Sequence, residues 1–136
     1  MRERRRLVHH RRGARQRSED PGQWTRNHGH HLTPDGRFLF FNNNVVGGEE
    51  PAAVWEVSLD EVAGTATKTW EYHFADPIIA FGDAERLPNG NALLTYPPGP
   101  IVEVDRSGAI VQSLTNTTHG FGFADFRTSL YGPPPR

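Results

Sequence analysis

Two stretches of this chain repeat one arrangement of turn residues and short apolar runs. The turn signal at 34–36 (Pro-Asp-Gly) is matched at 88–90 (Pro-Asn-Gly), and the strand-like segment at 55–57 (Trp-Glu-Val) is matched at 102–104 (Val-Glu-Val). Gly, Pro, Asn and Asp favour tight turns, and the β-branched and aromatic residues between them favour strands. The repeat therefore limits the chain to short antiparallel strands joined by turns.

Each copy of the repeat predicts four strands. The first copy has predicted strands at 30–33, 37–42, 54–59 and 67–72, and the second has turns at 88–90 and 105–108 and a proline-rich loop at 96–100. Four-stranded units that recur after roughly 40–50 residues are typical of β-propeller blades. We therefore predict an all-β, propeller-like protein with blades at about 28–72 and 81–114 and part of a third at 119–131.

The composition agrees with this class. The 136 residues include 14 Gly and 11 Pro, which suits a turn-rich chain, and 35% hydrophobic residues, which suffices for a modest core. The absence of cysteine excludes disulfides and thiolate metal sites. No apolar run approaches the roughly 18–20 residues that span a bilayer, and no apolar segment follows the basic start. We therefore expect neither a membrane span nor a signal peptide. The sequence does not decide the cellular compartment of the protein.

Positive charge is concentrated at the start of the chain. Residues 1–17 hold eight arginines and one acid, although the formal net charge of the whole chain is −1. Blocks of like charge usually remain solvated, so we predict a disordered basic arm at 1–19 ahead of a partial propeller at 20–136. Binding of nucleic-acid phosphates by the arm is an alternative, but the arm has no interleaved aromatic residues, and we expect no nucleic-acid partner.

Three histidines lie within four residues just before the first turn, at His28, His30 and His31. On a strand His28 and His30 share a face, and such a pair could hold Zn²⁺ or Cu²⁺. The spacing identifies no third ligand, so we predict no metal site. A catalytic or hydrogen-bonding histidine is the preferred interpretation.

The motifs occur in a characteristic order. They are His-His-Leu-Thr-Pro-Asp-Gly-Arg-Phe-Leu-Phe-Phe-Asn-Asn at 30–43, Trp-Glu-Val-Ser-Leu-Asp at 55–60, Phe-Gly-Asp-Ala-Glu-Arg-Leu-Pro-Asn-Gly-Asn at 81–91 and Val-Glu-Val-Asp-Arg-Ser-Gly at 102–108. Together they resemble the arylsulfotransferase (aryl-sulfate sulfotransferase) family of bacterial β-propeller proteins, over about residues 23–131. The resemblance implies transfer of a sulfuryl group from a phenolic sulfate ester to a phenol through a histidine, with no cofactor. It also implies a periplasmic or exported protein.

The resemblance further implies that the innermost strand of the first blade supplies the catalytic histidine, which is His30 or His31. The two side chains alternate in direction, and His30 is slightly preferred because it shares a face with His28 and Leu32. Both could instead hold loop backbone. The candidate substrate-binding residues are Asn42, Asn43, His119 and Arg127.

A closed propeller needs about four to eight blades, so we expect this chain to be a fragment of one. Two functions stay open. The first is an aryl-sulfate sulfotransferase that takes a phenolic sulfate donor and a phenol acceptor, an activity that a fragment can lack. The alternative is a non-catalytic, propeller-type interaction module that self-associates into a homo-oligomer.

Overall fold

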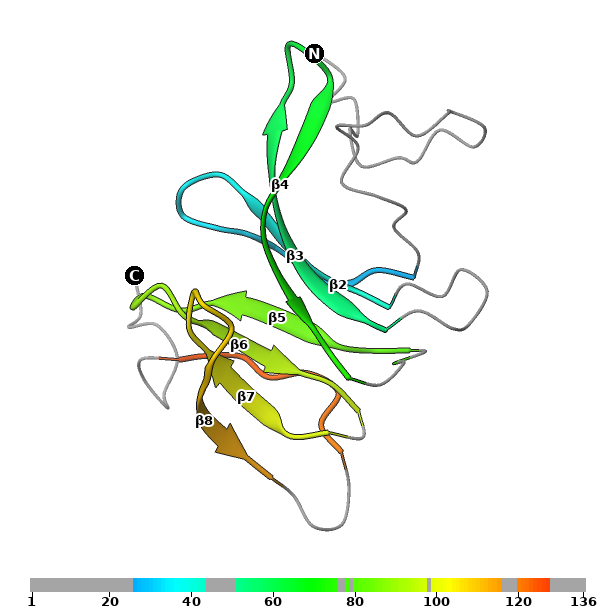
Figure 1. The fold of residues 1–136 in the computed structure, drawn as a ribbon, viewed down its shortest axis with the longest axis vertical. Helices are drawn as coiled ribbons and strands as arrows, with labels where there is room; N and C mark the ends of the chain where they lie inside the picture. The colour runs from blue at the N-terminus through cyan, green and yellow to red at the C-terminus, as the bar shows by residue number, and fades with distance from the viewer. Residues whose placement is uncertain are drawn as a thin grey trace, which may run out of the picture.

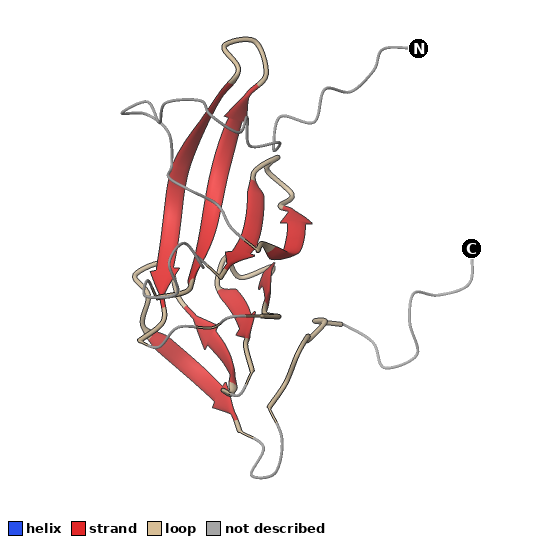
Figure 2. Ribbon diagram, turned by 90° about the vertical axis from the view of Figure 1, so that its right-hand side faces the viewer, coloured by secondary structure: helices blue, strands red, loops and turns tan. Residues whose placement is uncertain are grey.

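The computed structural model describes residues 26–43, 51–75, 78, 80–97, 99–115 and 120–127. Its strands are β1 (His28–Leu32), β2 (Phe38–Asn42), β3 (Ala53–Asp60), β4 (Thr65–His73), β5 (Asp83–Arg86), β6 (Ala92–Thr95), β7 (Ile101–Val104) and β8 (Ile110–Leu114). They form two four-stranded antiparallel sheets, each following chain order, β1-β2-β3-β4 and β5-β6-β7-β8 (Figure 1). The described residues contain strands and loops but no helix (Figure 2). The prediction of an all-β chain with two four-stranded antiparallel units is confirmed.

Three turns share one geometry, at 33–37, 87–91 and 105–109. In each, the N–H of the fourth residue donates to the carbonyl of the first, at 2.9 to 3.1 Å, and the N–H of the first donates to the carbonyl of the fifth, at 2.8 to 2.9 Å. The fourth residue is a glycine with φ of 83° to 88°. Glycine adopts this left-handed conformation without the steric penalty of a side chain. The turns predicted from these glycines are confirmed.

The third and fourth strands extend further than the sequence indicated. β4 spans Thr65–His73 where the sequence predicts 67–72, because the turn before it is only the exposed stretch 61–64. The resulting hairpin of β3 and β4 projects beyond the rest of the molecule, at the top of Figure 1. The first strand ends at Leu32, and Thr33 belongs to the following turn, where its hydroxyl accepts the N–H of Arg37 at 2.9 Å.

The main core lies between the two sheets. Side chains alternate along each strand, so one face of the first sheet meets one face of the second. The buried members of this cluster are Leu39, Phe41, Ala52, Val54, Phe74, Ile78, Ala84, Ala92, Leu94, Val102 and Val104. Trp70 and Tyr72 pack against the cluster together, as their shared face predicts. Each fully buried large apolar side chain contributes about 1.5–3 kcal/mol. This packing brings β5, the first strand of the second sheet, against β1 and β2.

The opposite face of the first sheet carries a second, smaller cluster. Its buried residues are Phe40, Ala53, Trp55 and Val57, with Phe38 and Leu59 packed against them. Val54 belongs to the main cluster whereas Trp55, Val57 and Leu59 belong to the second, which follows the alternation that the sequence predicts for this strand.

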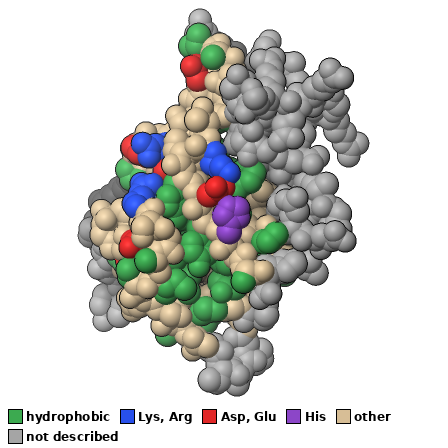
Figure 3. All heavy atoms as spheres, in the orientation of Figure 1, with side chains coloured by type: hydrophobic (Ala, Val, Ile, Leu, Met, Phe, Trp, Pro, Cys, Tyr) green, Lys and Arg blue, Asp and Glu red, His purple; other side chains and the backbone are tan. Residues whose placement is uncertain are grey.

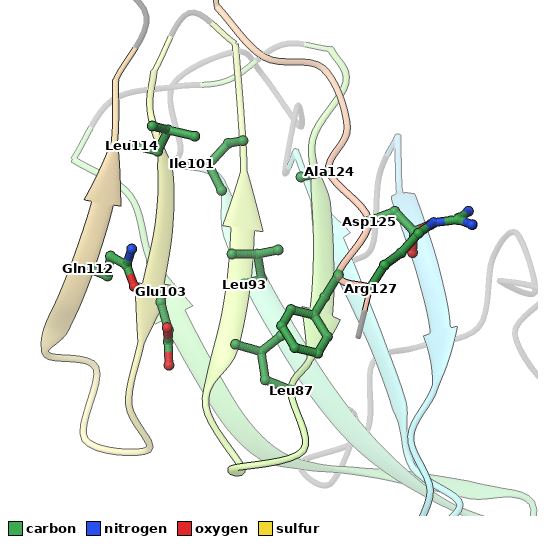
Figure 4. Close-up of a pocket in the computed structure, with 10 residues that line it drawn as sticks. Leu87, Leu93, Ile101, Glu103, Gln112, Leu114, Ala124, Asp125 and Arg127 are labelled. Carbon is green, nitrogen blue, oxygen red and sulfur yellow. The ribbon is translucent and has the colours of Figure 1, made fainter. Parts of the chain in front are cut away.

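Residues 120–127 run along the outer face of the second sheet without forming a strand. The N–H of Phe126 donates to Oε2 of Glu85 at 2.8 Å. Between this segment and the sheet is a cavity of about 380 Å³, toward which Leu93, Ile101 and Leu114 point (Figure 4). The predicted third unit at 119–131 extends on both sides of this segment into residues outside the described part of the chain. No helix in the described part is long and apolar enough to cross a membrane.

Candidate functional site

A histidine and an aspartate from the first strands of the two sheets form a hydrogen-bonded pair. His31 on β1 lies with Nε2 3.0 Å from Oδ1 of Asp83 on β5, and the two residues are 52 positions apart in the chain. The side chain of Asp83 is 10% exposed and that of His31 is 41% exposed. The pair, here called the His31–Asp83 dyad, therefore has a largely buried carboxylate and an imidazole that solvent can reach.

Gly29 allows β1 and β5 to approach closely enough for this pair to form. Its φ is +54°, and a Cβ added there would lie 2.2 Å from Oδ1 and 2.7 Å from Cα of Asp83. The pairing of β1 with β2 also shifts register between His28 and His31, as expected for a bulge. The glycine between the histidines thus sets both the bulge and the contact with β5.

The contact with Asp83 bears on which nitrogen of His31 carries a proton. Oδ1 of Asp83 also accepts the N–H of Ala84 at 3.0 Å. When Asp83 is ionised it can only accept hydrogen bonds, and Nε2 of His31 is then the donor in the 3.0 Å contact. The lone pair of a neutral His31 ring is then on Nδ1. A partly exposed imidazole with one nitrogen held by a carboxylate can act as a nucleophile or a general base.

The other two histidines contact aromatic rings. The ring of His30 stacks at 6.0 Å on Phe40, and that of His28 lies 6.2 Å from Phe81. Desolvation lowers the pKa of His30, and the neighbouring charges of His28 and His31 lower it further. His30 is therefore biased toward its neutral form. No carboxylate contact is described for His30, which distinguishes it from His31. The assignment of His30 or His31 as the catalytic residue stays a prediction.

Asn42 and Asn43 are buried at the end of β2. Nδ2 of Asn43 donates to the carbonyls of Ile78 at 2.7 Å and Phe81 at 2.9 Å, so it holds the crossover between the sheets. Phe81 has φ +62°, a conformation that costs a non-glycine residue about 1–2 kcal/mol. The structure gives Asn43 this backbone role, and substrate contact by either asparagine stays a prediction.

The two remaining predicted substrate residues are in the C-terminal part of the chain. Arg127 lines the cavity on the outer face of the second sheet and is paired with Asp125, with Nε at 2.7 Å and Nη2 at 2.6 Å. His119 lies outside the described residues. The structure thus brings His30 and His31 together on one strand and places Arg127 on a different surface.

A buried carboxylate with three arginines is the feature that sequence reasoning missed. Glu56 on β3 is 1% exposed; its Oε1 lies 3.0 Å from Nη1 of both Arg37 and Arg106, and its Oε2 lies 2.6 Å from Nη2 of Arg86. Burial alone would raise the pKa of Glu56, but the hydrogen bonds from these arginines hold it below the ordinary value. Arg86 and Arg106 come from the second sheet and its turns, so this cluster joins the two sheets.

The described residues contain no group of three or more His, Asp or Glu side chains arranged to hold a metal ion. No protein-family model, curated protein or solved structure matches the chain significantly. The resemblance to arylsulfotransferases stays an expectation.

Proposed function

We propose that the two sheets are neighbouring blades of an incomplete β-propeller and that the His31–Asp83 dyad transfers a sulfuryl group between phenols. Support for the blades comes from the two meanders in chain order and from the packing of the first strand of the second sheet against the first strand of the first. In a propeller the first strand of each blade lines the central channel. Both members of the dyad are on such strands.

The observation that carries the proposed reaction is the contact between Nε2 of His31 and the buried Asp83. In the first step Nδ1 of His31 attacks the sulfur of a phenolic sulfate ester. An N–S bond forms and the S–O bond to the aryl group breaks, so that the phenolate leaves and takes up a proton. Asp83 accepts the hydrogen bond from Nε2–H throughout, without taking the proton, and stabilises the positive charge that the ring gains.

In the second step an acceptor phenol attacks the same sulfur. The phenol loses its proton, the new S–O bond forms, the N–S bond breaks and His31 returns to its starting state. The products are one phenol and one new phenolic sulfate ester, so no oxidant, reductant or nucleotide is consumed. The resemblance to arylsulfotransferases supports this substrate class.

The test measures sulfuryl transfer from 4-nitrophenyl sulfate to phenol by the full chain. The release of 4-nitrophenol monitors the reaction. His31→Ala should abolish turnover, and Asp83→Asn should reduce it by about 10²- to 10⁴-fold. His30→Ala is the matched control on the same strand and should retain most of the activity. Full activity in His31→Ala, or no transfer by the wild-type chain, would contradict the proposal.

A second candidate function is self-association, and the last strand of the second sheet favours it. Ile110, Val111 and Leu114 on β8 are 56%, 54% and 58% exposed. On the side of the molecule seen in Figure 3, hydrophobic side chains gather over the second sheet. β8 pairs with β7 on one side, and no described strand pairs with its other side. Exposed edge strands with apolar side chains add strands from another chain.

Light scattering on the purified chain tests this candidate. The wild-type chain should be a defined oligomer, and Val111→Lys on the exposed edge should shift the mass toward the monomer. Lys68→Gln on β4 is a control for a general change in charge. A wild-type chain that remains monomeric at all concentrations tested would exclude self-association.

A further inference from the structure

Two exposed phenylalanines contact each other, and one of them is close in the sequence to the His31–Asp83 dyad. Phe81 precedes Asp83 by two residues. The ring of Phe81 lies 6.2 Å from that of His28 and 6.4 Å, edge to face, from that of Phe123. Phe81 is 53% exposed and Phe123 is 61% exposed. Three contacting rings thus form an aromatic surface outside the core.

The backbone of Phe81 is held in place at a steric cost. Its φ of +62° is in the left-handed region, where a phenylalanine is rarely found. Asn43 donates to its carbonyl, and a Cβ on the next residue, Gly82, would lie 2.6 Å from the ring of Phe41. The fold therefore fixes a strained residue whose large side chain adds little to the core. Such strain is concentrated at functional sites.

We propose that Phe81, Phe123 and His28 bind the planar aromatic ring of a substrate next to His31. The identity of the ligand as a phenol or its sulfate ester rests on the proposed sulfuryl transfer, whereas the site itself rests on the three rings and the strained backbone. Aromatic rings attract one another in edge-to-face and offset arrangements, which favours a planar ring over an aliphatic one of similar size.

Titration of the full ¹⁵N-labelled chain with phenol, monitored by NMR, tests the site. Phe81→Gly and Phe123→Ala should each weaken phenol binding by about 5- to 10-fold. Phe126→Ala is the matched control, because Phe126 is also exposed and lies on the same segment as Phe123. It should leave phenol binding unchanged. Cyclohexanol, which lacks the planar ring, should bind the wild-type chain several-fold more weakly than phenol.

The choice of glycine at position 81 separates binding from folding. Glycine adopts φ +62° without strain, so Phe81→Gly should be at least as resistant to thermal unfolding as the wild-type chain while it loses phenol affinity. A less stable Phe81→Gly with unchanged phenol affinity would overturn the proposal. Equal losses of phenol affinity in Phe81→Gly, Phe123→Ala and Phe126→Ala would overturn it as well.

The phenol-binding and sulfuryl-transfer measurements test the aromatic site and the proposed reaction separately. If phenol binds through Phe81 and Phe123 but no sulfuryl transfer occurs, the aromatic site stands and the proposed reaction is wrong. If transfer occurs with a phenol affinity that neither substitution changes, the reaction stands and this site is wrong.

Discussion

The guanidinium of Arg86 donates two hydrogen bonds to one carboxylate oxygen of Glu56, from Nε at 3.0 Å and from Nη2 at 2.6 Å, although the two residues belong to different sheets. The side chains are 5% and 1% exposed. Arg86 also lies over the ring of Trp70 at 4.5 Å, and the Trp70 indole donates to the carbonyl of Arg106 at 3.0 Å. Glu56 is therefore the centre of a polar network that fixes how the sheets pack.

Glu56→Gln should destabilise the chain strongly. The substitution preserves the shape of the side chain but leaves the buried Arg86 without its counter-charge, which typically costs about 3–5 kcal/mol. The free energy of unfolding in urea measures this. Glu71→Gln is the control, because the ion pairs of Glu71 with Lys68 and His73 are at the surface and contribute only about 0–1 kcal/mol. Similar losses for the two variants would contradict the role of Glu56.

The same carboxylate predicts a dependence of stability on acid pH. Because the folded state lowers the pKa of Glu56 below its ordinary value of 4.5, its contribution to stability is complete above that value. The contribution is lost as the pH falls through the lowered pKa of the folded state. Unfolding free energies measured from pH 6 down to pH 3 should therefore fall more steeply for the wild-type chain than for Glu56→Gln. Parallel profiles would rule out the lowered pKa.

Gly29→Ala should be more disruptive than an alanine at another left-handed glycine. At Gly29 the new Cβ would collide with the backbone and carboxylate of Asp83. At Gly36, which has φ +83°, the same Cβ meets nothing within 4 Å. We expect about 1 kcal/mol of destabilisation from backbone strain alone for Gly36→Ala and about 2–4 kcal/mol for Gly29→Ala. Thermal unfolding compares them, and equal effects would show that the close contact of β1 with β5 is unimportant.

The histidines on β1 predict a second pH dependence, near neutrality. Desolvation, with the charges of His28 and His31, lowers the pKa of His30 in the folded state below its ordinary value of 6.5. Its contribution to stability is therefore complete above pH 6.5 and decreases as the pH falls below that value. His30→Gln should flatten the stability profile between pH 7 and pH 5. An unchanged profile in His30→Gln would contradict this assignment.

The turns and strands could be predicted from the sequence because their causes are local. Pro-Asp-Gly and Pro-Asn-Gly place a glycine at the one turn position that needs a positive φ, and all three predicted turns formed with the same hydrogen bonds. The alternation of Trp70 and Tyr72 similarly predicted which side chains face the second sheet. These features depend on neighbours a few residues apart.

The ion pairs could not be predicted because their partners come from different sheets. Glu56 looks like an exposed strand residue in the sequence, and its partners Arg86 and Arg106 follow it by 30 and 50 positions. One signal was available: Phe38 to Phe41 are apolar on both faces of β2, so the sheet is covered on both sides and a charge beside it needs partners. The contact of His31 with Asp83 has no comparable local signal.

The most direct test of the proposed chemistry is the mass of the peptide that contains His31 after the chain has been incubated with 4-nitrophenyl sulfate. The digest is kept alkaline, because an N-sulfonated imidazole hydrolyses in acid. We expect a gain of one SO₃ group on His31, which is absent or strongly reduced in Asp83→Asn and is lost when phenol is added. A modified His30, or a wild-type chain that is never modified, would contradict this expectation.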